Sequence, residues 1–469
     1  MNLYIQVGNR LRYGVQKLYF SEGLIGQNWA KDICLTVAPD GIITHVETGI
    51  KSRNTAAFGP VLPAMPNVHS HAFQRAFAGL AEYKKPGKSD FWSWRTAMYG
   101  FAKHMTPEVL EVVASALYIE MLKAGYSAVG EFHYLHNADQ DQALAMSDAI
   151  IRAADISGIA LTHLPVLYQA SDFGGKAPEG GQLPFVHTVE EFNRLLQILA
   201  PRLVGRHQLG VAFHSLRAVS RDRFGPVINT LEKINLQAPI HIHIAEQTAE
   251  VDACLKHTGM RPVEWLLENQ PVDQRWCLIH ATHLVESEWQ ALAETGAVVG
   301  LCPTTEANLG DGLYPLAEFE NCGGRWAIGS DSHISIDARE ELRLLEYGQR
   351  LARQGRTILS GEDGGHTGLY LWQKAALSGA QALGQPVGKI AEGKRADLIV
   401  LDDSSPTFAG ASYGQVVDAF VFSGQPNPIS RVMVAGNWVV EDGRHRHEDE
   451  VFARYKKLVG DISVAMEEH

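Results

Sequence analysis

The sequence has few cysteines and no paired cysteine motif. Its five cysteines include no Cys-x-x-Cys pair, and their number is odd. We therefore expect neither a disulfide framework nor a structural zinc knuckle, and a reducing compartment fits this composition. Residues 1–16 also lack the apolar core and small-residue cleavage site of a secretion signal. Together these absences predict a cytoplasmic protein.

Excess positive charge and membrane-type apolar runs are missing too. Lys and Arg number 41 against 53 Asp and Glu, which leaves a formal net charge of −12. A chain of this sign repels nucleic-acid phosphates, and no basic patch is evident, so we expect no nucleic-acid partner. The uncharged segment 54–74 contains three prolines and two histidines, which excludes a membrane span there, and we expect no membrane partner.

The composition is that of an ordinary globular protein, with 45% hydrophobic and 20% charged residues. It argues against disorder, collagen-like repeats and a coiled coil. The sequence shows no fixed-period repeat and no low-complexity tract. Because 469 residues exceed what one small core absorbs, we expect one large domain and a smaller one.

Short apolar runs alternate with helical patterns through the middle of the chain. The eight runs are residues 61–68, 126–132, 159–167, 209–213, 240–245, 276–279, 297–301 and 326–329. Helix-like stretches such as residues 107–123 and 189–200 lie between several of them. Eight alternating units of this kind predict an α/β fold, a (β/α)8 TIM barrel over residues 61–385.

Both ends of the chain carry short β-rich runs separated by turn residues. The runs are residues 17–20, 33–37 and 42–46 near the start, and residues 397–401, 418–422 and 431–440 near the end. We expect the two ends, residues 1–60 and 386–445, to pair into one composite β-sandwich domain. Residues 446–469 are expected to form a C-terminal helical tail.

Two long segments follow candidate strands and have loop-like composition. Residues 83–105 are rich in aromatic residues, and residues 169–187 are rich in glycine and proline. Because barrel enzymes keep their chemistry at the carboxyl ends of the strands, both segments are candidates for a lid or substrate wall. The alternative is an oligomer contact or a plain surface insertion.

Polar residues gather where the apolar runs end. Residues i and i+2 of a strand point to the same face, so His69 and His71 are able to hold one metal ion. The fifth run adds His243, with Glu246 just beyond it, and the eighth run ends at Asp331. Three imidazoles and one carboxylate suit a divalent transition metal such as zinc. Taken singly, each of these residues has the alternative of being a satisfied polar group of the core.

Such a site would supply hydroxide for addition to an sp² carbon, followed by loss of a leaving group. Glu246 is suited to carry the water's proton to the leaving group, and Asp331 to accept it first. His280, which ends the sixth run, is suited to orient the water or to stabilise the developing charge. The fourth run holds no lysine for a carboxylated bridge, which favours one metal ion over two.

This set of motifs resembles the amidohydrolase superfamily. The His-x-His strand, the His-x-x-Glu strand, the later histidine and the Gly-Ser-Asp strand all match, and residues 393–400, Gly-Lys-Arg-Ala-Asp-Leu-Ile-Val, are similar to the signature that closes the family's β domain. The His-x-x-Glu spacing resembles the deaminase branch, which uses a single zinc ion and releases ammonia. Within that branch, four segments are most similar to the deiminases of histidine degradation. They are residues 65–75, 131–134, 214–219 and 302–312.

The resemblance implies a ligand set, a catalytic set and a substrate-binding set. One Zn²⁺ per chain would be held by His69, His71, His243 and Asp331. Proton transfer and activation would fall to Glu246, His280 and Asp331. Contacts to the substrate would come from Gln74, Tyr134, His214 and Arg217. The implied reaction is hydrolysis of N-formimidoyl-L-glutamate, a small dicarboxylate, to N-formyl-L-glutamate and ammonia.

The substrate-binding residues each have a plainer alternative. Arg217 offers the planar fork that a carboxylate needs, but it would also suit a salt bridge at the barrel rim. For Gln74 and Tyr134 the alternative is rim packing, and for His214 it is a cap on a backbone carbonyl. Supporting or structural roles are expected for three further histidines, His133, His283 and His333.

Two other functions stay open. A different deaminase of the superfamily would act on a nucleobase, a triazine or an adenosine derivative, and such flat uncharged substrates have no need of Arg217. A non-catalytic barrel scaffold has no reason to keep a full ligand set together with Glu246. The sequence leaves Glu306 and Asn308 as pocket candidates without a role. Because barrels with aromatic insertions often dimerise, we expect a homodimer.

Overall fold

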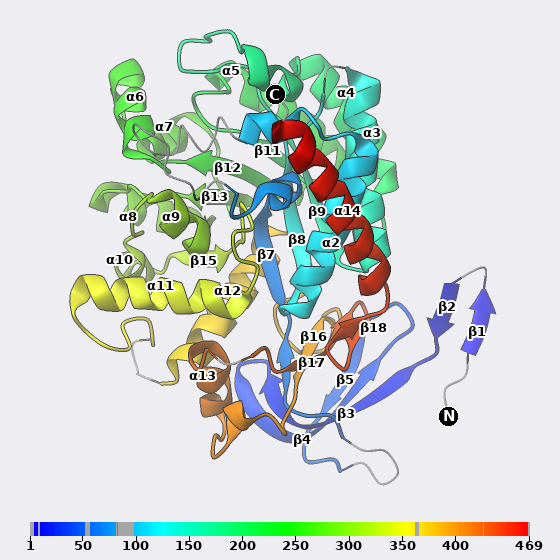
Figure 1. The fold of residues 1–469 in the computed structure, drawn as a ribbon. Coiled ribbons are helices and arrows are strands. Elements are labelled where there is room, and N and C mark those ends of the chain that lie inside the picture. Colours follow the sequence, from blue (N-terminus) through cyan, green and yellow to red (C-terminus); the bar gives the residue numbers. More distant parts are fainter. Residues whose placement is uncertain are drawn as a thin grey trace.

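The computed structural model describes residues 4–7, 10–51, 57–80, 82, 98–137, 139–361, 365–424 and 426–467. Figure 1 shows a barrel surrounded by helices and, below it, a smaller sheet that combines blue strands from the N-terminal part of the chain with orange strands from the C-terminal part. Most of the aromatic-rich segment expected as a lid, residues 83–97, lies outside the described residues.

Eight parallel strands form the barrel. They are β7 (Met65–Ser70), β8 (Tyr126–His133), β9 (Ala160–Leu167), β11 (Val211–Phe213), β12 (Ile240–Ile244), β13 (Trp276–His280), β14 (Val298–Leu301) and β15 (Arg325–Ile328). A short strand, β10 (Gln208–Leu209), pairs beside β9. The strands pair in chain order, and every residue of β8 and β9 is buried, as apolar runs covered on both faces require. The predicted (β/α)8 barrel is confirmed.

The barrel closes between its first and last strands. Ser70 and Asp331 form a parallel bridge, and the carbonyl of His69 accepts the amides of Ser330 and Asp331 at 3.2 and 3.0 Å. Gly329 permits this approach, because a Cβ at that position would lie 2.7 Å from the Cβ of His69. Closure therefore brings the first and the last predicted metal ligands together.

Helices cover the outside of the barrel (Figure 1). They are α2 (Pro107–Lys123), α3 (Gln140–Ser157), α4 (Val189–Leu199), α5 (Arg221–Ile234), α6 (Thr248–Thr258), α7 (Pro262–Asn269), α8 (Glu286–Thr295), α9 (Pro303–Leu309), α10 (Leu316–Asn321), α11 (Ala338–Arg353) and α12 (Thr367–Ala382). Side-chain caps fix where the first two begin. Thr106 accepts the amide of Val109 at 3.3 Å, and Asp139 accepts that of Gln142 at 2.9 Å. The short 3-10 turns are η1 (Ala72–Phe77), η2 (Gly180–Phe185) and η3 (Ala200–Arg202).

The smaller sheet joins strands from both ends of the chain, as predicted. Its members in spatial order are β19 (Arg444–His445), β18 (Asn437–Glu441), β17 (Ile429–Val434), β16 (Leu398–Leu401), β6 (Val61–Pro63), β3 (Gln16–Ile25), β4 (Asn28–Val37) and β5 (Ile43–Glu47). A separate hairpin joins β1 (Tyr4–Val7) and β2 (Arg10–Tyr13). The apolar run 61–68 is divided, because β6 pairs with β16 and β3 while β7 enters the barrel.

One predicted strand is wrong. Residues 418–422 belong to helix α13 (Gly414–Phe422), which follows the 3-10 turn η4 (Pro406–Phe408) and packs on α12. Its buried side chains include Val416, Val417, Phe420 and Val421, which share one face at helical spacing. A five-residue apolar run does not distinguish a buried helix from a strand, and here the residues before it complete the helical face.

The expected C-terminal tail forms α14 (Glu448–Glu467), which lies along α2 (Figure 1). Val451 packs on Ala116 and Ile119, and Lys123 pairs with Glu448 at 2.6 Å. Among the helices of the described residues, none is long and apolar enough to cross a membrane.

Candidate functional site

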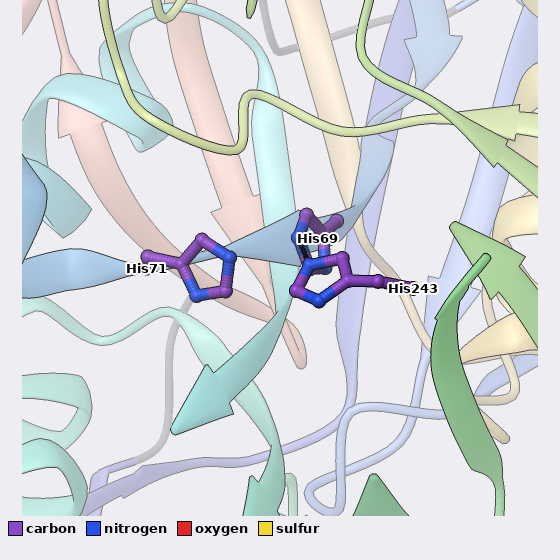
Figure 2. Close-up of side chains that lie close together, drawn as sticks. All are labelled: His69, His71 and His243. Carbon is purple, nitrogen blue, oxygen red and sulfur yellow. Dashed lines mark hydrogen bonds between the residues drawn. The ribbon is translucent and has the colours of Figure 1, made fainter. Parts of the chain in front are cut away.

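The four predicted metal ligands meet at the carboxyl ends of β7, β12 and β15. Figure 2 shows the rings of His69 and His71, from β7, gathered with that of His243, from β12. The Nε2 atoms of His69 and His243 are 3.0 Å apart. Asp331 Oδ1 lies 3.4 Å from His69 Nε2 and 3.3 Å from His71 Nε2. The ligand atoms of the three histidines lie within 4.8 Å of one another, and those of His69, His280 and Asp331 form a second group of this kind beside them.

Backbone carbonyls orient two of these rings. His71 Nδ1 donates to the carbonyl of Phe132 at 3.0 Å, and His243 Nδ1 donates to that of His214 at 3.1 Å. With the proton on Nδ1, each ring presents the Nε2 lone pair to the centre, as metal-binding histidines do. Burial lowers the pKa of His69, His71 and His243, which keeps the imidazoles neutral. Neutral nitrogen donors beside one carboxylate fit a zinc ion.

Glu246 and His280 face the same point from β12 and β13. His280 Nε2 is 4.0 Å from Glu246 Oε1 and 3.8 Å from Asp331 Oδ2. Burial raises the pKa of the Glu246 carboxyl to about 7, although His280 opposes the shift. Burial lowers the pKa of His280, but the carboxylates of Glu246, Glu306 and Asp331 outweigh it and raise that pKa to about 10. A carboxyl that titrates near neutrality is suited to proton transfer.

The backbone is strained where these side chains leave the strands. Five non-glycine residues at the barrel mouth have positive φ angles: Ala245 (52°), His280 (66°), Ala281 (50°), Asp331 (44°) and His333 (61°). Such angles cost free energy and persist where surrounding contacts hold them, commonly at active sites. Here they turn the strand-end side chains toward the barrel axis.

The four predicted substrate-binding residues line one hollow with this centre. The hollow has a volume of about 60 Å³ and is also bounded by Met98 and Leu309. Gln74 Nε2 donates to the hydroxyl oxygen of Tyr134 at 2.8 Å. His214 Nδ1 lies 3.1 Å from Ser215 Oγ, and the His214 carbonyl accepts from His243 Nδ1.

Arg217 differs from the other three predicted substrate-binding residues in its contacts. Its side chain is half-buried, and among the residues that the structure describes it forms no hydrogen bond and no ion pair. The rim salt bridge that the sequence left open is therefore not formed within the described chain. Its charge acts on two carboxyls nearby, because it opposes the rise that burial causes in the pKa of Glu250 and, to a smaller extent, of Glu246. A guanidinium that faces a hollow without a direct hydrogen bond has the geometry that suits a carboxylate.

Of the three further histidines, His333 supports the site most directly. Its Nε2 lies 3.2 Å from Ser70 Oγ, and its Nδ1 lies 3.0 Å from Ser330 Oγ. It therefore links β7 to the segment that carries Asp331. His283 contributes its carbonyl, which accepts Arg261 Nη2 at 2.6 Å. His133 packs instead in a buried group of rings with His136 and His163.

Four acidic residues near the centre were not predicted or were left without a role. Glu131 accepts from Ser70, Ala72 and Tyr118, and Glu306 accepts from His280 Nδ1 at 3.2 Å. The other two are Glu250, which accepts the amides of residues 245 and 246, and Asp311, which bonds to the side chain of residue 247. Asn308 donates to Glu82 at 2.6 Å, outside the hollow's lining. Glu131, Glu306 and Asp311 lie in segments that the resemblance singled out, 131–134 and 302–312, whereas Glu250 lies in none of them.

Comparison with known proteins gives a consistent result. The model of the amidohydrolase family matches residues 61–439. The chain is 46% identical over 451 residues to a formimidoylglutamate deiminase of Pseudomonas aeruginosa, covering 95% of this chain and 99% of the relative. It is 26% identical to a 5-methylthioadenosine/S-adenosylhomocysteine deaminase of Natronomonas pharaonis, covering 88% and 91%.

Two solved structures show the same architecture. An amidohydrolase from Brucella melitensis is 42% identical and superposes with a TM-score of 0.89, covering 95% of this chain and 99% of that one. A zinc-bound adenosine deaminase from Xanthomonas campestris, at 19% identity and a TM-score of 0.79 over 96% and 98% of the chains, is similar in fold.

Proposed function

Because the chain belongs to the amidohydrolase family, we propose that it hydrolyses N-formimidoyl-L-glutamate to N-formyl-L-glutamate and ammonia. The observation that carries the proposal is Arg217, a half-buried guanidinium that makes no hydrogen bond or ion pair with the described residues and lies in the same hollow as Glu246 and His280. Its charge suits a carboxylate of the substrate. The relative from P. aeruginosa, matched over almost its whole length, supports the same substrate.

One zinc ion would be held by His69, His71, His243 and Asp331, whose nitrogen and oxygen atoms converge. When bound, zinc supplies hydroxide near neutral pH for attack on the formimidoyl carbon. The Phe132 and His214 carbonyls keep two of the imidazoles turned toward the centre.

Glu246 would manage the protons of the reaction. Its carboxylate takes a proton from the attacking water and passes it to the nitrogen that leaves as ammonia. The carbon–oxygen bond forms in this step and makes the carbon tetrahedral. Glu246 then takes the proton of the new hydroxyl group and passes it to the same nitrogen, so that the carbon–oxygen double bond forms, the carbon–nitrogen bond breaks, and the formyl product and ammonia result. His280 Nε2, which faces both Glu246 and Asp331, is placed to donate a hydrogen bond to the charge that develops on the tetrahedral carbon's substituents.

The remaining pocket residues would orient the dicarboxylate. Arg217 pairs with one carboxylate through its planar fork. Tyr134 lines the same hollow, and a phenol hydroxyl is a group that donates to a carboxylate oxygen. His214 lies against Tyr134, with 5.9 Å between the ring centroids, and completes the wall. Binding remote from the reacting carbon positions that carbon for attack.

An ammonia-release assay on purified, zinc-loaded protein tests the proposal. N-formimidoyl-L-glutamate is compared with guanine, cytosine and adenosine under the same conditions. Rapid release from the formimidoyl compound alone is the expected result. Release from a nucleobase or nucleoside instead would show that the substrate-binding assignment is wrong, and a zinc-loaded protein that releases no ammonia from any of them would contradict the proposal as well.

We also propose that the enzyme works in the cytoplasm as a homodimer in histidine degradation. All five cysteines are free, as a reducing compartment requires. Light scattering coupled to gel filtration would test the dimer, and a monomeric mass would contradict it.

A further inference from the structure

We propose that Glu306 is a positioning residue that fixes the orientation of the His280 imidazole. The inference rests on the proposed function, in which the Nε2 atom of His280 faces the reacting group. Glu306 lies in the segment 302–312, whose motif is part of the resemblance but whose carboxylate has no assigned role.

Glu306 is held firmly where it meets His280. It sits in the first turns of α9 and is 5% exposed. Its Oε1 atom accepts the backbone amide of Cys302 at 2.8 Å and the Nδ1 atom of His280 at 3.2 Å. The peptide group at Cys302, followed by Pro303, anchors the carboxylate from the helix side. The carboxylate is therefore fixed in place and can hold the His280 ring through its Nδ1 atom.

Orientation matters for this histidine because only one of its edges faces the centre. The ring can turn over about its bond to Cβ, which exchanges the places of its nitrogen and carbon atoms. With the Nδ1 proton donated to Glu306, Nε2 points to Glu246 and Asp331. Without that acceptor, a turned ring would present a carbon atom in place of Nε2. A carboxylate that orients a histidine in this way commonly affects activity through the histidine alone.

A second interpretation of this group is a metal site, because ligand atoms of His280, Cys302 and Glu306 lie within 4.8 Å of one another. Two observations argue against it. Oε1 of Glu306 already accepts two N–H groups. Burial raises the pKa of the Cys302 thiol, so the sulfur stays protonated and is a poor ligand. Hydrogen bonding accounts for the arrangement.

A purely structural role, as a cap on α9, is the interpretation that the experiment must exclude. The fold provides a matched control in Glu341 of α11. Its carboxylate accepts the amide and the hydroxyl of Thr304 at 2.9 and 2.6 Å, so it caps the same helix turn from a fully buried position. Among the described residues, its carboxylate bonds to Thr304 and not to His280. A capping role predicts similar effects at both residues, whereas a positioning role predicts an effect on catalysis at Glu306 alone.

The test compares zinc-loaded Glu306→Ala, Glu306→Gln and Glu341→Gln with the parent protein. We expect kcat of Glu306→Ala to fall by about 10- to 100-fold, the range for residues that orient a functional histidine. KM should change little, because the substrate-binding residues are untouched. Glu306→Gln keeps an acceptor oxygen at the same place and should recover much of kcat. Glu341→Gln should resemble the parent.

Proton NMR of histidine-labelled protein gives a readout that needs no substrate. A downfield Nδ1–H resonance should be present in the parent and in Glu341→Gln, shifted upfield in Glu306→Gln, and absent from Glu306→Ala and His280→Asn. An unchanged resonance in Glu306→Gln, or a Glu306→Ala variant with parental kcat, would overturn the proposal. If the parent did not hydrolyse N-formimidoyl-L-glutamate, the proposed function would fail, but the resonance would still decide whether Glu306 holds His280.

Discussion

The carboxylate of Glu131 accepts a hydrogen bond of 2.6 Å from Ser70, the residue that separates the two histidines of β7. The same carboxylate accepts the backbone amide of Ala72 at 2.7 Å and the hydroxyl of Tyr118 at 3.0 Å. Glu131 thus holds the side chain that precedes His71 and the backbone amide that follows it. Because all three partners donate, an acceptor with two oxygens is required at this position.

Replacing Glu131 by Gln should weaken metal binding. The amide nitrogen of Gln cannot accept, so one of the three donors is left unpaired in a buried site. We expect zinc affinity to fall by about 10- to 100-fold, measured by competition with a chromophoric chelator. Glu120→Gln is the control, since that carboxylate pairs with Arg75 at 2.9 Å and is partly exposed. Zinc affinity equal to that of the parent in Glu131→Gln would refute the role.

Arg217→Met should remove most activity on N-formimidoyl-L-glutamate. The substitution keeps an apolar stem of similar length but leaves a substrate carboxylate unpaired, so we expect kcat/KM to fall by about 100-fold or more. The kcat/KM of Arg217→Lys should lie between those of the parent and Arg217→Met, because an ammonium keeps the charge but lacks the planar fork. The exposed Arg221, four residues along, serves as the control through Arg221→Met. Unchanged kcat/KM in Arg217→Met would point to an uncharged substrate.

His163 should make the fold sensitive to acid. Burial, with a smaller contribution from His136, lowers the pKa of His163 to about 3, and both ring nitrogens lack partners among the described residues. The unfolded chain takes up a proton near the ordinary value of about 6.5, whereas the folded chain does not. The stability from the neutral ring is therefore complete above pH 6.5 and is lost as the pH falls toward 3, by about 1.4 kcal/mol per pH unit.

Urea unfolding between pH 7 and pH 4 measures this effect. His163→Phe removes the titrating group, so the free energy of unfolding should decline less steeply with falling pH than in the parent. The exposed His45 provides the control, and His45→Gln should keep the parental slope. Equal slopes for His163→Phe and the parent would show that His163 does not contribute.

Arg395→Met should destabilise the smaller domain. Arg395 and Asp397 form a buried pair with two contacts of 2.8 Å, and Asp397 also accepts the amide of Ala435 at 2.9 Å. Losing the guanidinium leaves a buried carboxylate uncompensated, which costs about 3–5 kcal/mol. Thermal and urea unfolding measure the loss. Arg152→Met, which breaks an exposed pair with Glu111, should cost at most about 1 kcal/mol. A similar small loss for both variants would contradict this account.

Local patterns in the sequence determined the barrel and the identity of its strand-end residues. A strand repeats every two residues, so His69 and His71 had to share a face wherever the strand lay. The carboxyl ends of parallel strands all lie on one side of a barrel. Residues such as His243, His280 and Asp331 were therefore expected to be neighbours. These inferences needed only the periodicity of short segments. The same reasoning failed for residues 418–422, because a short apolar run is compatible with either kind of element.

The supporting contacts were decided by the tertiary structure alone. Ser70 and Glu131 are 61 residues apart in sequence, and Asn67 and Ser330, which bond at 2.6 Å, are 263 apart. No local pattern relates such positions, because their meeting depends on strand register and on the closure of β7 against β15. The sequence by itself therefore determined which chemical groups stand at the mouth of the barrel. The closed barrel decided which buried donors and acceptors hold them, since a buried polar group must find its partner wherever the fold places one.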